Sequence, residues 1–107
     1  MAIRTLAAKE LTTTSLTSIF TVGIGNTATI ANAVICNASS SQIDVEVYVC
    51  SPSVDVLVTT AKLPGGVGKS LIVRELIGGL NSQWSIKVKP SQTTQVNVVI
   101  YGKTVNA

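Results

Sequence analysis

The sequence predicts an all-β, single-domain antiparallel β-sandwich of about seven or eight strands, jelly-roll or immunoglobulin-like in kind. The chain has 107 residues, enough for one domain with one core. Its 15 Val, 10 Ile and 13 Thr make 38 side chains branched at Cβ, which favour strands over helices. Short apolar runs bounded by Gly, Pro, Asn or Ser recur about every 8–12 residues, a spacing typical of sandwiches.

Residues 1–15 are the least strand-like part of the chain. Their apolar residues follow no clear period, and three threonines succeed them at positions 12–14. We expect an extended N-terminal arm that either lies along a neighbouring subunit or frays in solvent. Residues 16–107 are then the β-sandwich domain.

Seven segments of that domain have the pattern of strands. Within residues 43–50, isoleucine and valine alternate with polar or small side chains, the period of a half-solvated strand. Residues 28–37 are apolar on both faces and are expected to be buried on both. Beyond Pro52, we expect Val54, Val56 and Val58 to face inward. The predicted strands are residues 16–22, 28–37, 43–50, 54–60, 70–77, 83–89 and 94–101.

Two cysteines, Cys36 and Cys50, lie on consecutive predicted strands. If these strands pair as a hairpin, Cys36 sits beside the connecting loop and Cys50 at the far end of its strand. Their Cα atoms then lie beyond the roughly 7 Å that a disulfide allows. We therefore expect two free thiols, as in a reducing compartment.

The composition excludes several classes of chemistry. The chain has no His, so histidine-assisted nucleophiles and imidazole metal ligands are impossible. Five carboxylates supply few ligands for cations and few acid pairs. Charged residues make up 12% of the chain against roughly 25% in an average protein, so the net charge of +3 does not indicate nucleic-acid binding. No apolar run approaches the roughly 18 residues that span a bilayer. We predict a non-enzyme without catalytic residues, cofactor, metal or membrane partner.

Residues 64–70, PGGVGKS, resemble a phosphate-binding loop. In that motif the first glycine precedes Gly-Lys-Ser by five positions, and Leu63 stands there instead. The loop must also open a helix, whereas the residues after Lys69 are strand-like. We interpret the segment as a glycine-rich surface loop.

Some polar and aromatic residues leave alternatives open. Asp44 and Glu46 share one strand face, as do Lys87 and Lys89, so they can form cross-strand ion pairs if their strands are neighbours. Trp84 is interpreted as a core anchor, with ligand stacking as the alternative. Tyr48 and Tyr101 point away from the apolar face of their strands, as interface contacts or as ordinary exposed residues.

Four segments carry a resemblance to a group of viral proteins. They read AVICNAS at 33–39, VEVYV at 45–49, QWSIKV at 83–88 and QVNVVIYG at 95–102. Over about two thirds of its length the chain resembles small β-sandwich virion proteins of tailed bacteriophages. Relatives usually place an apolar residue and a Gly-Asp turn where this chain has Asn81-Ser82-Gln83. This difference leaves the choice between capsid and tail open.

The resemblance implies a structural virion protein, made in the host cytoplasm. We expect a capsid cement or decoration protein that binds the major capsid protein as a homotrimer, with a neck, tail or fibre protein as the alternative. A carbohydrate- or ligand-binding module, with Trp84 or Tyr48 as its platform, is a second alternative. The expected interface residues are Ile3, Arg4, Leu6, Leu11, Tyr48, Arg74 and Tyr101.

Overall fold

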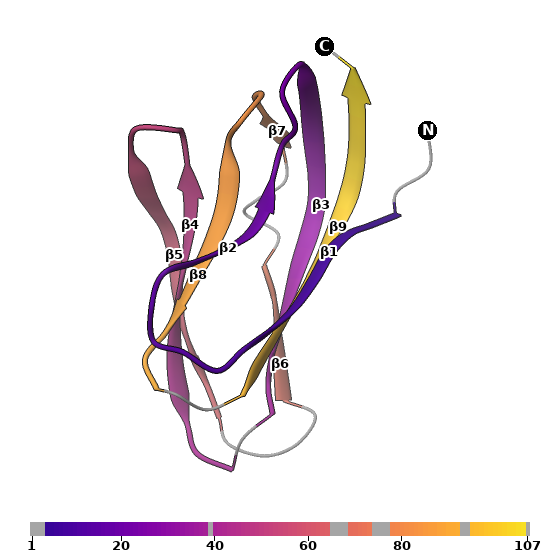
Figure 1. Ribbon diagram of the computed structural model, residues 1–107. Coiled ribbons are helices and arrows are strands. Elements are labelled where there is room, and N and C mark those ends of the chain that lie inside the picture. The colour runs from indigo at the N-terminus through magenta and orange to yellow at the C-terminus, as the bar shows by residue number, and fades with distance from the viewer. Residues whose placement is uncertain (1–3, 39, 65–68, 74–77, 93–94, 107) are drawn as a thin grey trace.

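The chain folds into two antiparallel sheets packed face to face, which confirms the predicted β-sandwich (Figure 1). The computed structural model describes residues 4–38, 40–64, 69–73, 78–92 and 95–106, with the backbone alone for 69–73, 78 and 106. In this part of the chain the strands are β1 (Arg4–Leu11), β2 (Thr17–Thr21), β3 (Asn26–Asn37), β4 (Ile43–Cys50), β5 (Asp55–Leu63), β6 (Lys69–Val73), β7 (Gly78–Leu80), β8 (Ser85–Pro90) and β9 (Val96–Asn106). No helix that could cross a membrane occurs among these residues.

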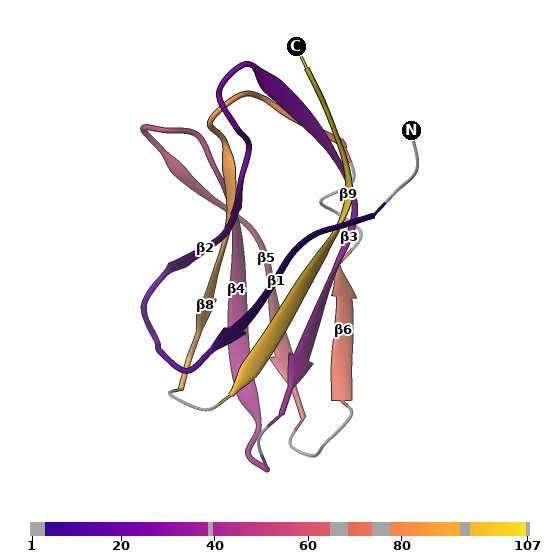
Figure 2. The same cartoon turned by 45° about the vertical axis from the view of Figure 1, so that its right-hand side comes forward.

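The strand order is that of a jelly roll. One sheet, sheet A, has the order β1-β9-β3-β6 with β7 beside β3, and the other, sheet B, has the order β2-β8-β4-β5. The pairs β3 with β6, β2 with β8 and β1 with β9 are nested around the β4–β5 hairpin. The chain therefore crosses repeatedly between the two sheets, as Figure 2 shows from the side. Of the two predicted kinds of sandwich, the structure has the jelly roll.

The core lies between the sheets and is built from alternate strand positions. In β4, Ile43, Val45 and Val47 are buried while Asp44 is exposed, as the period of two predicts. In β3, Ile30 and Ile35 are fully buried. The other buried members are Leu11, Ile19, Val22, Ala28, Ala33, Leu63, Leu80, Ile86, Val88, Val96, Val98 and Ile100.

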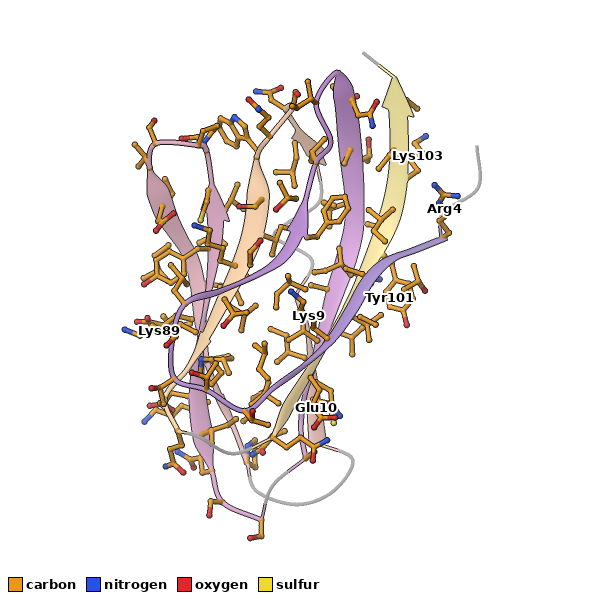
Figure 3. All side chains as sticks on the ribbon, in the orientation of Figure 1. Arg4, Lys9, Glu10, Lys89, Tyr101 and Lys103 are labelled. Carbon is orange, nitrogen blue, oxygen red and sulfur yellow. The ribbon has the colours of Figure 1, made fainter. Side chains whose placement is uncertain are left out.

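Strand β1 occupies residues for which the sequence predicted an arm. It pairs along β9 of its own chain, and Leu11 lies opposite Val96 in the core with only 3% of its surface exposed. Lys9 hides the strand pattern, because its position faces the sandwich interior, where an apolar residue is expected. Its Nζ instead donates a hydrogen bond to the Ser18 carbonyl oxygen of β2 at 2.9 Å. Lys9 is labelled in Figure 3. Residues 4–11 thus belong to the sandwich domain.

The hairpin assumed for the two cysteines does not form. Cys36 lies in β3 of sheet A, whereas Cys50 ends β4 in sheet B. Both thiols are free. The expected burial of residues 28–37 on both faces is met in part, because Val34 and Cys36 on the outer face are half-buried.

Two irregular strands, β1 and β3, lie close to β9 on either side at Gly102. This residue lies opposite Arg4 on one side and Ile30 on the other, and register shifts in β1 and β3 follow both pairs. A Cβ atom at position 102 would lie 2.1 Å from the Thr29 carbonyl oxygen and 3.1 Å from Cδ1 of Leu6. Glycine is therefore the residue that allows β1 and β3 to flank β9 at this point.

Candidate interaction surface

Large exposed apolar side chains gather at one end of the sandwich. Four of them follow one another along the β4–β5 turn and the start of β5, and they are exposed by 54% at Val54, 52% at Val56, 47% at Leu57 and 38% at Val58. We call these four residues the β5 apolar edge. Figure 1 shows the β4–β5 turn at the same end of the molecule as the β2–β3 connection and the end of β9, where two further exposed residues lie, Ile24 and Val105.

The β5 apolar edge is open because β5 is the last strand of sheet B. Val56 lies opposite Val49, so both side chains point to the inner side of the sheet. Val49 packs against the core, but Val56 remains half exposed. The sequence predicted that Val54, Val56 and Val58 face inward. Val56 does so, yet all three side chains are at least 38% exposed. Alternation along a strand determines which side of the sheet a side chain faces, but it does not determine whether the second sheet covers that side chain.

The backbone of this edge is held in strand geometry by the preceding turn. The Ser51 amide donates to the Val54 carbonyl oxygen at 2.9 Å, and the Val54 amide donates to Oγ of Ser51 at 3.2 Å. Hydrogen-bonded and non-hydrogen-bonded pairs alternate along an antiparallel ladder, so Val56 is the next residue whose backbone groups point toward β4. The backbone groups of Asp55 and Leu57 consequently point to the open edge.

A small polar group supports the same turn from the outer side of sheet B. Nζ of Lys87 lies 3.2 Å from Oδ1 of Asp55. The pKa of the Cys50 thiol is raised, first by burial and then by its hydrogen bond with Asp55. The pKa of Asp55 is lowered by that hydrogen bond and by Lys87. Cys50 is fully buried, so this thiol stays protonated and inaccessible, unlike a nucleophilic cysteine.

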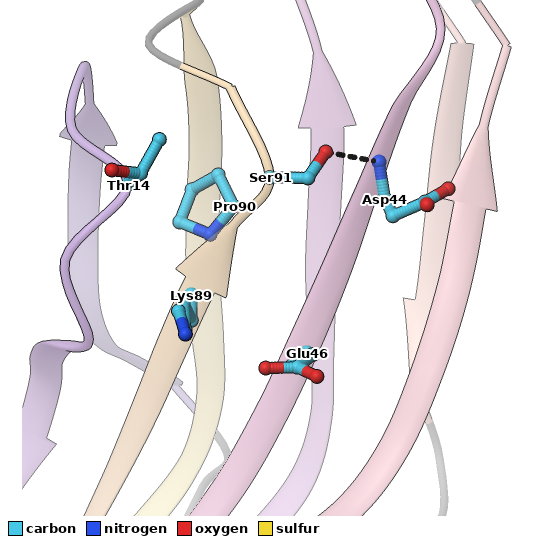
Figure 4. A pocket seen from close by; sticks show the side chains of 6 residues that line it. All are labelled: Thr14, Asp44, Glu46, Lys89, Pro90 and Ser91. Carbon is cyan, nitrogen blue, oxygen red and sulfur yellow. Dashed lines mark hydrogen bonds between the residues drawn. The ribbon is translucent and has the colours of Figure 1, made fainter.

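A shallow hollow of about 390 Å³ lies near the other end of sheet B, where β4 begins (Figure 4). Oγ of Ser91 accepts a hydrogen bond from the Asp44 amide at 2.9 Å. The Tyr48 hydroxyl donates to Oε1 of Glu46 at 3.0 Å, and this bond is the main cause of a raised Tyr48 pKa. Within the described residues, no three Cys, Asp or Glu side chains gather to hold a metal ion. The lining residues are Thr14, Asp44, Glu46, Lys89, Pro90 and Ser91.

The acidic and basic residues of β4 and β8 do lie on neighbouring strands. Glu46 is opposite Lys89 in the register, and Tyr48 is opposite Lys87. The ion pair formed by Lys87 is with Asp55 of β5 instead. Charges of both signs therefore alternate across the outer face of sheet B, and exposed pairs of this kind contribute at most about 1 kcal/mol each.

The described residues predicted as N-terminal interface contacts differ in burial. Leu11 belongs to the core of its own chain, and Leu6 packs against that core. Arg4 is exposed at the start of β1 (Figure 3). Ile3 and Arg74 lie outside the described residues.

The two tyrosines lie on opposite faces of the molecule. Tyr101 is half-buried on the outer face of sheet A, where it is opposite Thr5 (Figure 3). Tyr48 is half-buried on the outer face of sheet B, opposite Leu57. Tyr48 therefore borders the β5 apolar edge, whereas Tyr101 lies on the other sheet, so these two predicted interface residues do not share a surface.

Two other predicted features can be placed. Trp84 is half-buried and packs against the core, and its backbone carbonyl accepts a hydrogen bond from the Val22 amide at 2.8 Å. This placement agrees with a core anchor. Residues 65–68 of the glycine-rich segment lie outside the described residues, and Lys69 begins strand β6 where a phosphate-binding loop requires a helix.

The interpretation of the sequence missed the β5 apolar edge, although one signal was present. Val56, Leu57 and Val58 are three consecutive apolar residues, which a strand must distribute over both faces. Such a run occurs in a strand buried on both sides or in one that meets a partner. The exposure of these three side chains excludes the first possibility within this chain.

The sequence matches no protein-family model. It also matches no curated protein. Among solved structures, the fold is similar to the core of the Drosophila protein NLP, whose crystal structure concerns pentamer formation and histone binding. The TM-score is 0.56 at 16% identity, over 99% of this chain and all of that chain, a likeness that concerns the fold. An infectious bursal disease virus structure, Gt strain, has a TM-score of 0.36 at 9% identity, over 97% of this chain and 36% of that one.

Proposed function

We propose that the protein is a structural virion component that works through protein–protein contacts, as a capsid cement or decoration protein. The observation that supports this proposal is the β5 apolar edge, whose four residues are each at least 38% exposed. A strand edge of this composition invites association and is normally covered by a partner.

The jelly roll supports the proposal as an analogy between folds. This topology recurs in viral capsid and lectin domains, although a fold alone does not determine a function. The resemblance of residues 28–101 to tailed-bacteriophage virion proteins is a second, independent reason. In this role the chain adds stability by burying apolar surface between neighbouring subunits, with the major capsid protein as its partner.

The protein is expected to act as an oligomer, and a homotrimer is our proposal. The NLP core studied for pentamer formation indicates that a sandwich of this shape can be arranged around a symmetry axis. The histone binding named for that protein is not proposed for this chain. Its net charge of +3 would repel a basic partner.

The proposal requires that a bacteriophage genome encode the chain, and the test begins with virions of that bacteriophage, purified on a density gradient. Mass spectrometry and labelled-antibody microscopy should find the protein on the capsid surface. Analytical ultracentrifugation of the purified protein should give an oligomer and should show co-sedimentation with capsids that lack it. Label on the neck, tail or fibre would move the protein to the alternative location, and its absence from purified particles would refute the proposal.

A further inference from the structure

Building on the proposed function, we propose that the β5 apolar edge binds a second copy of this chain by antiparallel pairing of β5 with β5. The two-fold axis passes beside Val56, so that residues 54–58 of one copy meet residues 58–54 of the other. Sheet B of each protomer then continues into sheet B of its partner.

The backbone carries the first part of this inference. The groups of Asp55 and Leu57 point to the open edge, as the turn geometry and the register with β4 require. In a two-fold arrangement about Val56, Asp55 lies opposite the partner's Leu57. These two residues are therefore a hydrogen-bonded pair, while Val56 and the partner's Val56 form the closer, non-hydrogen-bonded pair.

The side chains match in the same register. On the inner side of the sheet, Val56 meets the partner's Val56. In the same register Val54 lies opposite the partner's Val58, the residue at the register shift of β5. These valines are 38% to 54% exposed in the isolated chain, and each copy covers those of the other. Aliphatic cross-strand contacts of this kind are the usual source of sheet stabilisation.

Charge does not oppose the pairing. Residues 56–61 contain no charged side chain, and the nearest acid, Asp55, is neutralised by Lys87 at 3.2 Å. The register shift at Val58, the last residue of the contact, and the exposed Lys62 discourage pairing along the rest of β5. The pairing is thus confined to the exposed half of the strand.

The contact is small. Five residues on each side are far fewer than the roughly 20–30 a side of a standard interface. We therefore expect a reversible, concentration-dependent dimer, which a larger assembly would reinforce through its other contacts.

The experiment introduces one cysteine at a time into the full chain under mild oxidation, with the two native free thiols removed as Cys36→Ser and Cys50→Ser. Residues of a non-hydrogen-bonded antiparallel pair have Cα atoms about 4.5 Å apart, within the range that a disulfide bridges. Val56→Cys should give a covalent dimer whose cross-linked peptide joins position 56 to position 56. Thr60→Cys is the matched control, because Thr60 is exposed on the same strand outside the contact. We expect at least tenfold more dimer from Val56→Cys, and equal yields would overturn the proposal.

A second pair of variants keeps the proposal testable without cross-linking. Val56→Lys places two like charges at the axis and should raise the dimer dissociation constant at least tenfold, whereas Thr60→Lys should change it little. Circular dichroism confirms that both variants fold. A monomer at every concentration, or equal effects of the two lysines, would refute the pairing.

The outcomes separate this inference from the proposed function. Val56→Lys protein that is monomeric but still attaches to virions would leave both standing as independent contacts. If the protein forms the dimer but is absent from virions, the proposed function is refuted and the β5–β5 pairing is supported. Attachment to virions without a disulfide cross-link at position 56 would support the function and refute the pairing.

Discussion

Replacing Leu11 by Ala tests whether the N-terminal segment stabilises its own chain or a neighbour. Leu11 is 97% buried among the core residues, opposite Val96 of β9. The substitution removes three carbon atoms, a transfer loss of about 2.4 kcal/mol at roughly 0.8 kcal/mol per carbon. The cavity left behind raises the expected loss to about 3 kcal/mol, inside the range of about 2–5 kcal/mol for such changes.

Urea unfolding of the monomer, followed by tryptophan fluorescence of Trp84, measures this loss. With a denaturant dependence of about 1.5 kcal/mol per molar urea, the midpoint should fall by about 2 M. The adjacent exposed Glu10, changed to Ala, is the control and should shift stability by less than about 0.5 kcal/mol. A shift in Leu11→Ala below about 0.3 M would contradict the placement of β1 in the sandwich. So would a loss that appears only at high protein concentration, since an intersubunit contact behaves in that way.

Five further substitutions at four positions probe the backbone and the buried thiol. Gly102→Ala should lower the free energy of unfolding by at least about 2 kcal/mol, because its Cβ would lie 2.1 Å from the Thr29 carbonyl oxygen and overlap it. Gly79→Ala is the control. A Cβ at that position meets no atom within 4 Å, so the free energy of unfolding should change by less than about 1 kcal/mol. Gln83 has a φ of 69°, so Gln83→Gly should raise the melting temperature, with a gain of about 0.5 kcal/mol, whereas Gln83→Val should lower it. Folding raises the pKa of Cys50, so its stabilising contribution is complete below the pKa of an unfolded thiol and is lost as the pH rises through the folded pKa. The urea midpoint of the parent should therefore fall more steeply between about pH 8 and 10 than that of Cys50→Ser, and parallel curves would contradict this assignment.

Most of the strands could be predicted because their inward positions are apolar without interruption. Residues 43–50 show this best, since every second side chain from Ile43 to Val47 is buried. Strand β1 could not be found in this way. Its inward Lys9 is solvated at the open side of the sandwich, where it binds the Ser18 carbonyl oxygen. A lysine therefore interrupts the apolar alternation of β1, and the fold tolerates it because this side of the sandwich is open to solvent.

The candidate surface was less accessible to prediction than the fold. The valines of β5 alternate as core residues do, yet the second sheet does not cover them. Conversely, Leu6 and Leu11 sit in a segment without a clear period, but they pack into the core. A sequence pattern indicates which side chains share a face of a strand, whereas their burial depends on which strand lies at the edge of the sheet.

The sequence by itself determined the class of the fold and the absence of histidine chemistry. Branched apolar side chains that recur with a period of two are buried when two sheets pack face to face. This conclusion requires no knowledge of which strands pair. Only the tertiary structure decided that the chain rolls into a jelly roll, that β3 and β4 separate into different sheets and that β5 is left at the edge. The physical reason is that strand order depends on contacts between distant segments, which share no local signal in the sequence.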